Sequence, residues 1–216
     1  MESVLPHRPV PSRAAARFGG VALLAVVLAG CGHVPLTTMA RLSTFDPGAV
    51  DPAQLRIAIR APDWMEPRSG EATLKFTLGR RGGAPVREER FALEPAEAPQ
   101  ETARLAAHRR AGERIWPWRV TAADAARIRA LQEEARALRA SDASLDRLTL
   151  AAGIEACRRG EAPAGPIRTT TLLQPDAATG YLTLLDGVDL RETARKAGVD
   201  LDERLPPCGK AALRAG

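Results

Sequence analysis

The sequence predicts an α+β domain over residues 51–216, built mainly from antiparallel β-strands and most simply arranged as a sandwich. About six or seven segments alternate apolar and polar residues, as strands with one buried face do. One segment, 122–140, instead repeats apolar residues at the helical interval. Turn-forming residues separate the alternating segments, and we find no internal repeat or domain boundary in the sequence.

Four strands are predicted in the first half of the domain, over 55–60, 72–78, 86–93 and 115–120. The clearest is 72–78, where Leu74, Phe76 and Leu78 share one face. The Arg-Gly-Gly unit after it is a motif found in RNA-binding segments. A single copy between two strands is typical of a hairpin turn. Residues 94–112 are predicted to form a loop or a weak surface helix.

The second half begins with the helix over 122–140. Thr121 and Asp124 form a start close to a capping box, and Ile128 and Leu131 belong to its apolar stripe. Further strands are predicted over 148–156, 167–173 and 181–185, and a short helix from Asp189 to Gly198. The tail through Cys208 is expected to be extended.

Residues 1–30 have the three parts of an export signal. Arg8, Arg13 and Arg17 precede an apolar run that begins near Phe18 and ends in small residues. The run has about a dozen residues, whereas a membrane-spanning helix needs about 20. Leu28-Ala29-Gly30-Cys31 resembles the lipobox of bacterial lipoproteins. The alternative is an ordinary secretory signal followed by a chance cysteine.

The lipobox resemblance implies cleavage before Cys31, a diacylglyceryl thioether on its sulfur and an acyl chain on its new amino group. Residues 31–50 would form the lipidated tether. Two or more acyl chains hold a protein firmly to a bilayer. In such lipoproteins an aspartate after the cysteine commonly retains the protein in the inner membrane. Gly32 occupies that position, so the expected location is the periplasmic face of the outer membrane.

Cys157 and Cys208 remain once Cys31 carries the lipid. Two cysteines in an oxidising compartment most often pair, and this pair would close a loop of about 50 residues, worth roughly 4 kcal/mol. A redox or metal role for free thiols is the alternative. It lacks a C-x-x-C spacing and a nearby histidine.

The arrangement is also similar to a group of alphaproteobacterial lipoproteins. The similarity rests on Val34-Pro35-Leu36 with Asp51-Pro52, on Glu155-Ala156-Cys157-Arg158, and on Asp186-Gly187-Val188-Asp189-Leu190. It supports the compartment and the cysteine pair and implies no mechanism.

The charge balance does not favour a nucleic-acid partner. The chain has 31 basic and 26 acidic residues. Removal of the signal leaves 28 against 25, a mild and evenly spread basicity. No nucleotide-binding loop is present, and no noncovalent cofactor or metal is expected. Asp200-Leu201-Asp202-Glu203 lacks the glycine of a calcium loop and is expected to be a solvated face.

The search for catalytic groups leaves His33 and His108 after processing. His108 lies in an arginine-rich stretch without a G-x-S-x-G motif, which is typical of a surface histidine. Carboxylate pairs remain open, because their separation depends on the fold.

Trp64, Trp116 and Trp118 are the candidate binding surface. Pro117 cannot donate to a ladder and predicts an edge strand, on which Trp116 and Trp118 share a face. Packing in the core is the alternative explanation for these side chains. Two classes of function follow: a non-catalytic lipoprotein that binds an envelope protein or cell-wall component, and a periplasmic hydrolase that uses carboxylates or His108.

Overall fold

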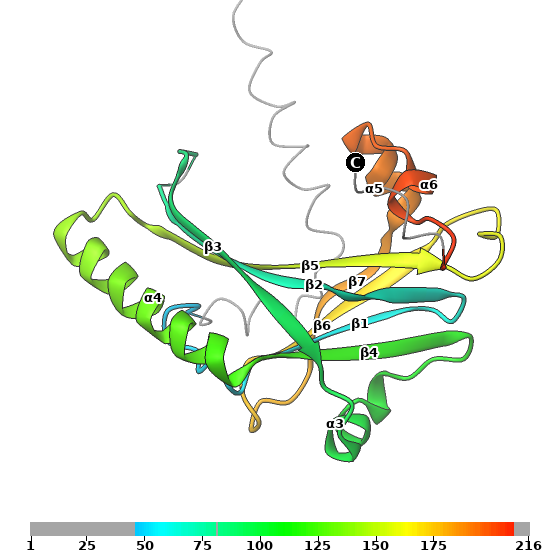
Figure 1. Cartoon of the computed structure of the whole chain (residues 1–216), viewed down its shortest axis with the longest axis horizontal. Helices are drawn as coiled ribbons and strands as arrows, with labels where there is room; N and C mark the ends of the chain where they lie inside the picture. The colour runs from blue at the N-terminus through cyan, green and yellow to red at the C-terminus, as the bar shows by residue number, and fades with distance from the viewer. Residues whose placement is uncertain (1–45, 81, 210–216) are drawn as a thin grey trace, which may run out of the picture. The chain divides into compact units, whose positions relative to one another are not determined.

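Seven antiparallel strands form one curled sheet in the computed structural model, which describes residues 46–80 and 82–209 (Figure 1). The strand order is β5-β2-β3-β4-β1-β6-β7, so β5 and β7 are the two edges. The predicted α+β class, mainly antiparallel, is confirmed. The strands are β1 (Arg56–Pro62), β2 (Met65–Gly79), β3 (Pro85–Pro95), β4 (Glu113–Val120), β5 (Arg147–Arg158), β6 (Arg168–Gln174) and β7 (Leu182–Asp189).

The sheet curls where β3 meets β4. These strands pair over three residue pairs, Leu93↔Val120 to Pro95↔Trp118, whereas β2 pairs with β5 along almost its whole length. The halves β5-β2-β3 and β4-β1-β6-β7 therefore bend around a shared core, so that one curled sheet takes the place of the two packed sheets of a sandwich. The strands remain one continuous sheet, because β3 pairs with β2 of its own half and with β4 of the other half.

The inner face of the sheet carries the predicted alternation. Leu74, Phe76 and Leu78 of β2 are almost completely buried, as are Phe91 of β3 and Ile57 of β1. Strand β2 begins seven residues earlier than predicted, at Met65, and its pairing with β5 shifts between Pro67 and Ala72. Gly70 lies in this irregular stretch with φ +74°, a conformation that other residues rarely adopt.

Strand β4 is a central strand, so the predicted edge position is wrong. The reason lies in which side of β4 the proline faces. The Pro117 carbonyl accepts a hydrogen bond from the Ala96 amide at 2.9 Å, beyond the end of β3. In an antiparallel strand, the nitrogen and the carbonyl of one residue point to the same side. The proline nitrogen therefore faces a side on which the ladder has already ended, and no ladder bond is lost.

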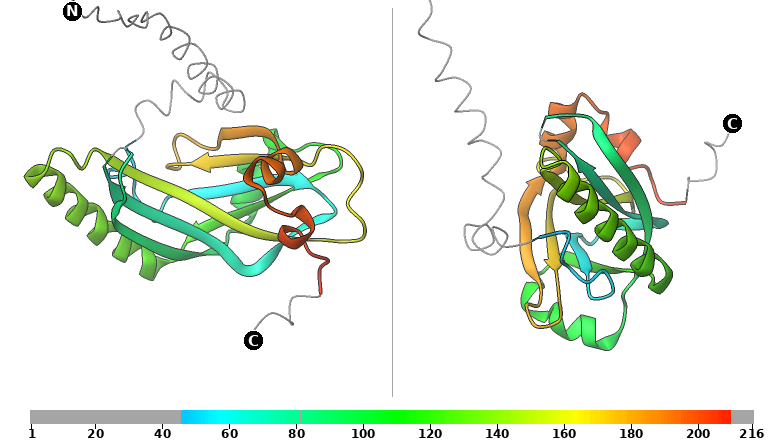
Figure 2. Two further views of the ribbon diagram at one scale, coloured as in Figure 1. Left: turned by 90° about the horizontal axis from the view of Figure 1, so that it is seen from above. Right: turned by 90° about the vertical axis from the view of Figure 1, so that its left-hand side faces the viewer.

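Helix α4 (Ala122–Ser141) closes one end of the core (Figures 1 and 2). The Thr121 hydroxyl accepts the Asp124 amide at 3.1 Å, as the sequence predicts. Ile128 and Leu131 are buried against the inner face. Gln132 is also buried, and its amide donates to the carbonyls of Pro47 and Val50, each at 2.9 Å. The segment that leads into β1 is thereby fixed to α4.

The other helices are short. Helix α3 (Pro99–Arg104) and the 3-10 turn η2 (Ala106–His108) lie within the segment expected to be a loop or weak surface helix. Helix α5 (Leu190–Ala197) follows β7 directly and ends at Gly198, as predicted. Helix α6 (Leu201–Arg204) was not predicted. No helix in the described part of the chain combines the length and apolar character that a membrane crossing requires.

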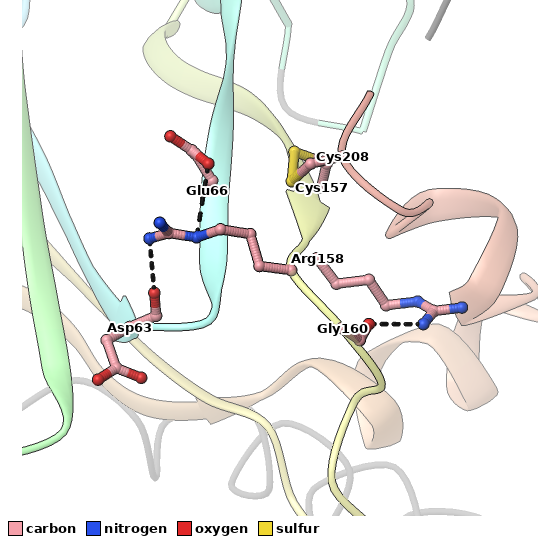
Figure 3. Close-up of a disulfide and its surroundings, with 7 residues drawn as sticks. Asp63, Glu66, Cys157, Arg158, Gly160 and Cys208 are labelled. Carbon is pink, nitrogen blue, oxygen red and sulfur yellow. Dashed lines mark hydrogen bonds and ion pairs between the residues drawn. A yellow bond between two sulfur atoms is a disulfide. The ribbon is translucent and has the colours of Figure 1, made fainter. Parts of the chain in front are cut away.

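Cys157 at the end of β5 and Cys208 in the tail are joined by a disulfide, with their Cα atoms 4.9 Å apart (Figure 3). The tail also pairs with β5 through its backbone: the Arg158 amide donates to the Pro206 carbonyl and the Cys208 amide donates to the Arg158 carbonyl, each at 2.9 Å. Arg159 donates to the Asp63 carbonyl at 3.0 Å and ion-pairs with Glu66 at 3.6 Å. The segment that carries α5 and α6 is thus fixed at both of its ends, to β7 and to β5.

The predicted export signal (1–30), the predicted lipidation site Cys31, most of the predicted tether (31–45), His33 and Arg81 lie outside the described residues.

Candidate binding site

An apolar cleft lies between the two edge strands and extends from the core beside α4 to the end of the sheet that α5 and α6 cover. It consists of two adjoining cavities, each of about 470 Å³. We name them the covered cavity, which α5 and α6 also line, and the tether-side cavity, which Pro47 lines. Ala152, Thr171 and Leu185 line both cavities. Each volume falls in the range of small-molecule sites, roughly 300–1,000 Å³.

The inner face of the sheet forms the floor of the covered cavity. Ile59 and Ala61 reach it from β1 and Trp116 from β4. These side chains are on the floor because they alternate with residues that point to the outer face. The edge strands form the walls, with Ile154 on β5 and Val188 on β7.

The edge strands are apolar but little buried. Strand β7 has no buried residue, although it carries Leu182, Leu184, Leu185 and Val188. On β5, Ala152 is exposed, even though it lies opposite the buried Leu74. In a closed sheet these side chains would face one another. Here Leu184, Leu185 and Val188 of β7 and Ala152 of β5 line the cleft instead.

Helices α5 and α6 cover one side of the cleft. Leu190, Ala194 and Ala197 of α5 line the covered cavity, yet no residue of α5 is buried. The Asp189 carboxylate begins the helix: one of its oxygens accepts the amides of Arg191 at 3.0 Å and Ile167 at 3.2 Å. The helix therefore presents its apolar side to a space rather than to a packed core.

The chemistry of the cleft is almost entirely hydrophobic. Among the described residues that line the covered cavity, the charged ones are Glu155 and Arg204. Hydroxyl groups come from Thr169, Thr171 and Thr193. No group of His, Cys, Asp or Glu side chains in the described part of the chain is arranged to hold a metal ion. The cleft thus offers apolar contact, with few hydrogen bonds.

A charged cluster lies on the opposite, outer face of the sheet. Its centre is Arg60, whose side chain is 12% exposed. The guanidinium approaches Glu113 at 2.6 Å and Asp186 at 3.5 Å, and donates to the Thr170 hydroxyl at 3.0 Å. It also donates to the His108 carbonyl at 3.0 Å. These bonds join β1, β4, β6, β7 and the η2 turn, which is a structural role.

A second group on the outer face centres on Glu101, a buried residue of α3. Its carboxylate accepts the Tyr181 hydroxyl at 2.9 Å and pairs with Arg104 at 3.0 Å and Arg56 at 3.7 Å. Burial, followed by the bond to Glu101, raises the pKa of Tyr181 far above its ordinary value. The phenol therefore stays a neutral donor.

The His108 ring lies beside Tyr181 in an edge-on arrangement, with ring centroids 6.5 Å apart. Partial burial lowers the pKa of His108, and a bond with the Tyr181 backbone opposes that shift. The His108 imidazole thus contacts the ring and the backbone of Tyr181, whose hydroxyl donates to Glu101.

The three predicted tryptophans do not form one exposed platform. Trp118 is 5% exposed and belongs to the core beside α4. Trp116 points to the same face and lines the covered cavity. Trp64 is partly buried in a small cluster with Met65, at the far end of the cleft. Core packing therefore accounts for Trp118, and the cleft for Trp116.

Asp200, Asp202 and Glu203 belong to the unpredicted helix α6. The Asp200 carboxylate accepts the Asp202 amide at 2.9 Å, so it acts as a helix cap.

Sequence reasoning missed the cleft. Its walls come from β5, β7 and α5, which are far apart in the chain. One available signal was the run Leu182-Thr183-Leu184-Leu185, which carries more apolar residues than a strand with one buried face needs.

Comparison of the chain with protein-family models, with curated proteins and with solved structures gave no match.

Proposed function

We propose that this chain is a lipid-anchored protein of the bacterial envelope. It is exported, cleaved before Cys31 and lipidated there, and its domain lies on the periplasmic face of the outer membrane. The domain acts without catalysis, as a binding component. The observation that carries the binding function is the apolar cleft between β5 and β7.

The lipobox sequence supports the anchor. The described chain begins at residue 46, about 15 residues after Cys31, and an extended chain of that length spans at most roughly 50 Å. The domain would therefore work close to the bilayer. An inner-membrane location fits less well, because Gly32 replaces the aspartate that commonly retains such proteins there.

The Cys157–Cys208 bond supports the compartment. Disulfides persist in oxidising environments such as the periplasm and are rare in the reducing cytosol. The bond also has a structural purpose here, since it fixes the segment that covers the cleft.

The shape and lining of the cleft favour binding over catalysis. A hydrolase would need an acid, a base or a nucleophile facing a substrate site. The carboxylates of Glu101 and Glu113 instead pair with Arg56, Arg60 and Arg104 on the outer face. The periplasmic hydrolase that uses carboxylates or His108 therefore remains the second candidate.

Mass spectrometry of the mature amino terminus tests the anchor. We expect residue 31 to be the first residue and to carry a diacylglyceryl group and an acyl group. The Cys31→Ala variant should accumulate as the unlipidated precursor. A mature wild-type terminus that is free and unmodified would contradict the lipoprotein proposal.

Separation of the two membranes tests the location. We expect the wild-type protein in the outer-membrane fraction, facing the periplasm and accessible to protease only after the outer membrane is permeabilised. Recovery with the inner membrane would overturn this part of the proposal and leave the anchor intact.

A further inference from the structure

We infer that the cleft between β5 and β7 holds an acyl chain of an envelope lipid. This inference rests on the lipid-anchored function proposed above and names the ligand class of the same site. An acyl chain is a long apolar group that makes no hydrogen bonds, and both properties can be compared with the cleft.

The first support is the amount of apolar surface that the fold leaves uncovered. Leu148, Leu150 and Ile154 of β5 pack against the core and are still only partly buried. Across the cleft, β7 and α5 contribute apolar side chains and have no buried residue. Burial of apolar surface is the main favourable term in association, so this surface favours an apolar occupant.

The second support is shape. The two cavities adjoin at Ala152, Thr171 and Leu185, so that together they run along the edge strands rather than forming one round pocket. The inner face of the sheet, from Ile57 near α4 to Met65 near the disulfide, provides the floor. A chain of methylene groups fits such an elongated space.

The third support is the scarcity of polar partners. A peptide inserted under α5 would bring backbone N–H and C=O groups into the cleft, and each would need a hydrogen bond. The side chains that line the covered cavity offer three threonine hydroxyls together with Glu155 and Arg204, and unpaired backbone groups lie along the outer edges of β5 and β7. Glu155 and Arg204 are exposed and suit a polar head group outside the cleft better than groups within it.

The fourth support is the source of the ligand. Pro47 lines the tether-side cavity and lies 16 residues after Cys31. An extended chain of that length limits the distance between the cavity and the bilayer to roughly 50 Å. Membrane lipids are therefore the apolar molecules present at the highest local concentration.

Photo-crosslinking of the full chain in cells tests the inference. Cells are given palmitic acid that carries a diazirine and a terminal alkyne, and they incorporate it into their lipids. After ultraviolet irradiation, the protein is purified, reduced and digested with trypsin. We expect light-dependent adducts on the peptides 148–158, which covers β5, and 169–191, which covers β7. The adduct mass distinguishes a phospholipid from a free fatty acid.

The same experiment separates the two proposals. Lipidation of Cys31 places the label on peptide 31–41 without light, whereas an acyl chain in the cleft is attached only after irradiation. Label on 31–41 alone would overturn the acyl-chain inference and leave the anchor intact. Light-dependent label on the cleft peptides with no label on 31–41 would overturn the anchor and leave the acyl-chain inference intact.

Two variants fill the cleft. Ala152→Trp and Leu185→Trp enlarge residues that line both cavities, and we expect each to lower the light-dependent labelling about tenfold, equivalent to about 1.4 kcal/mol. Thr73→Trp is the matched control, because Thr73 lies on the outer face of the neighbouring strand, opposite Gly153. Thermal unfolding identifies a variant that has lost its fold, and the other variant then decides the result.

Equal labelling of Ala152→Trp, Leu185→Trp and wild type would overturn the inference. Adducts that map to other peptides would also overturn it. A polypeptide that occupies the cleft would exclude the lipid and leave peptides 148–158 and 169–191 unlabelled, which counts against the inference in the same way.

Discussion

Helices α4 and α5 both have an apolar side facing the inner surface of the sheet, yet their burial differs completely. Helix α4 buries Ala125, Ile128 and Leu131 against β2, β3 and β4. Helix α5 buries none of its residues, although Leu190 and Ala194 face the cleft. An amphipathic pattern therefore identifies a helix and its apolar side. Whether that side packs against protein depends on the strands opposite.

The strands show the same difference. Beside α4 the sheet is curled and continuous, and Phe76 and Leu78 are 0% exposed. Beside α5 the sheet ends at two edges, β5 and β7, and apolar side chains of the same types remain partly exposed. The α4 end of the molecule thus supplies stability, and the cleft end supplies a surface that another molecule can cover.

The tryptophan pair of β4 gives the largest expected effect and tests this contrast within one strand. Trp118→Ala removes a side chain that is 5% exposed, and we expect a loss of about 3–5 kcal/mol in unfolding free energy through the cavity left behind. Trp116→Ala removes a side chain from the floor of the cleft, and we expect a loss of about 1–2 kcal/mol in unfolding free energy. Denaturant unfolding measures both. A Trp118→Ala protein as stable as wild type would contradict the assignment of the core.

Loss of the disulfide should have the next largest effect. The bond closes a loop of 51 residues by sequence separation, so Cys157→Ala combined with Cys208→Ala should lower stability by about 2–4 kcal/mol. The loss should be accompanied by faster proteolysis of the α5–α6 segment, because one of its two attachments is gone. Unfolding with limited proteolysis checks this, with the double variant in reducing buffer as control. Cleavage of the double variant within α4 alone would contradict the expectation that the α5–α6 segment loosens first.

The helix caps should show the contrast on a smaller scale. Thr121→Ala leaves the Asp124 amide of α4 without its acceptor, at an expected cost of about 1 kcal/mol. Asp200→Ala removes the equivalent bond from α6, which has no buried residue, and we expect about 0.5 kcal/mol. The midpoints of denaturant unfolding provide the comparison. If Asp200→Ala lowered the unfolding free energy as much as Thr121→Ala or more, helix α6 would be as tightly packed as α4, contrary to this expectation.

The smallest expected effect is a pH dependence at His108. Burial lowers the pKa of this imidazole, so between that lowered value and the ordinary one near about 6.5 the unfolded state binds more protons. Stability should therefore be complete above about pH 6.5 and fall as the pH decreases below it. The His108→Gln variant should lose this part of the dependence. Identical profiles for the two proteins between about pH 5 and 7 would contradict the shift.

The sequence predicted those parts of the fold that depend on neighbouring residues. Alternation together with turn-forming residues located all seven strands, and the capping pair Thr121 and Asp124 located the start of α4. Pairing of strands is a long-range property, so the single curled sheet could not be read from the same pattern. The wrong prediction at Pro117 has this origin. The sequence shows that Pro117 lacks a backbone N–H donor, but whether a neighbouring strand lies beside its nitrogen to accept a bond depends on the sheet topology.

The candidate site was predicted only in part. The prediction that Trp116 and Trp118 share one face is confirmed, since both point inward. The sequence could not show that α4 covers the Trp118 side chain, whereas the Trp116 side chain faces the open cleft. That difference arises because β5 and β7 end the sheet on either side of the cleft.

The attachment of residues 47–51 to α4 determines how the domain responds to force. The Gln132 amide holds the carbonyls of Pro47 and Val50, and Arg129 pairs with Asp51 at 2.7 Å. In the proposed lipid-anchored form, a pull from the membrane would enter the domain at this point and would be resisted by the bonds to α4. Because those bonds lie at the α4 end, tension on the tether should detach the first turns from α4 before it changes the spacing of β5 and β7.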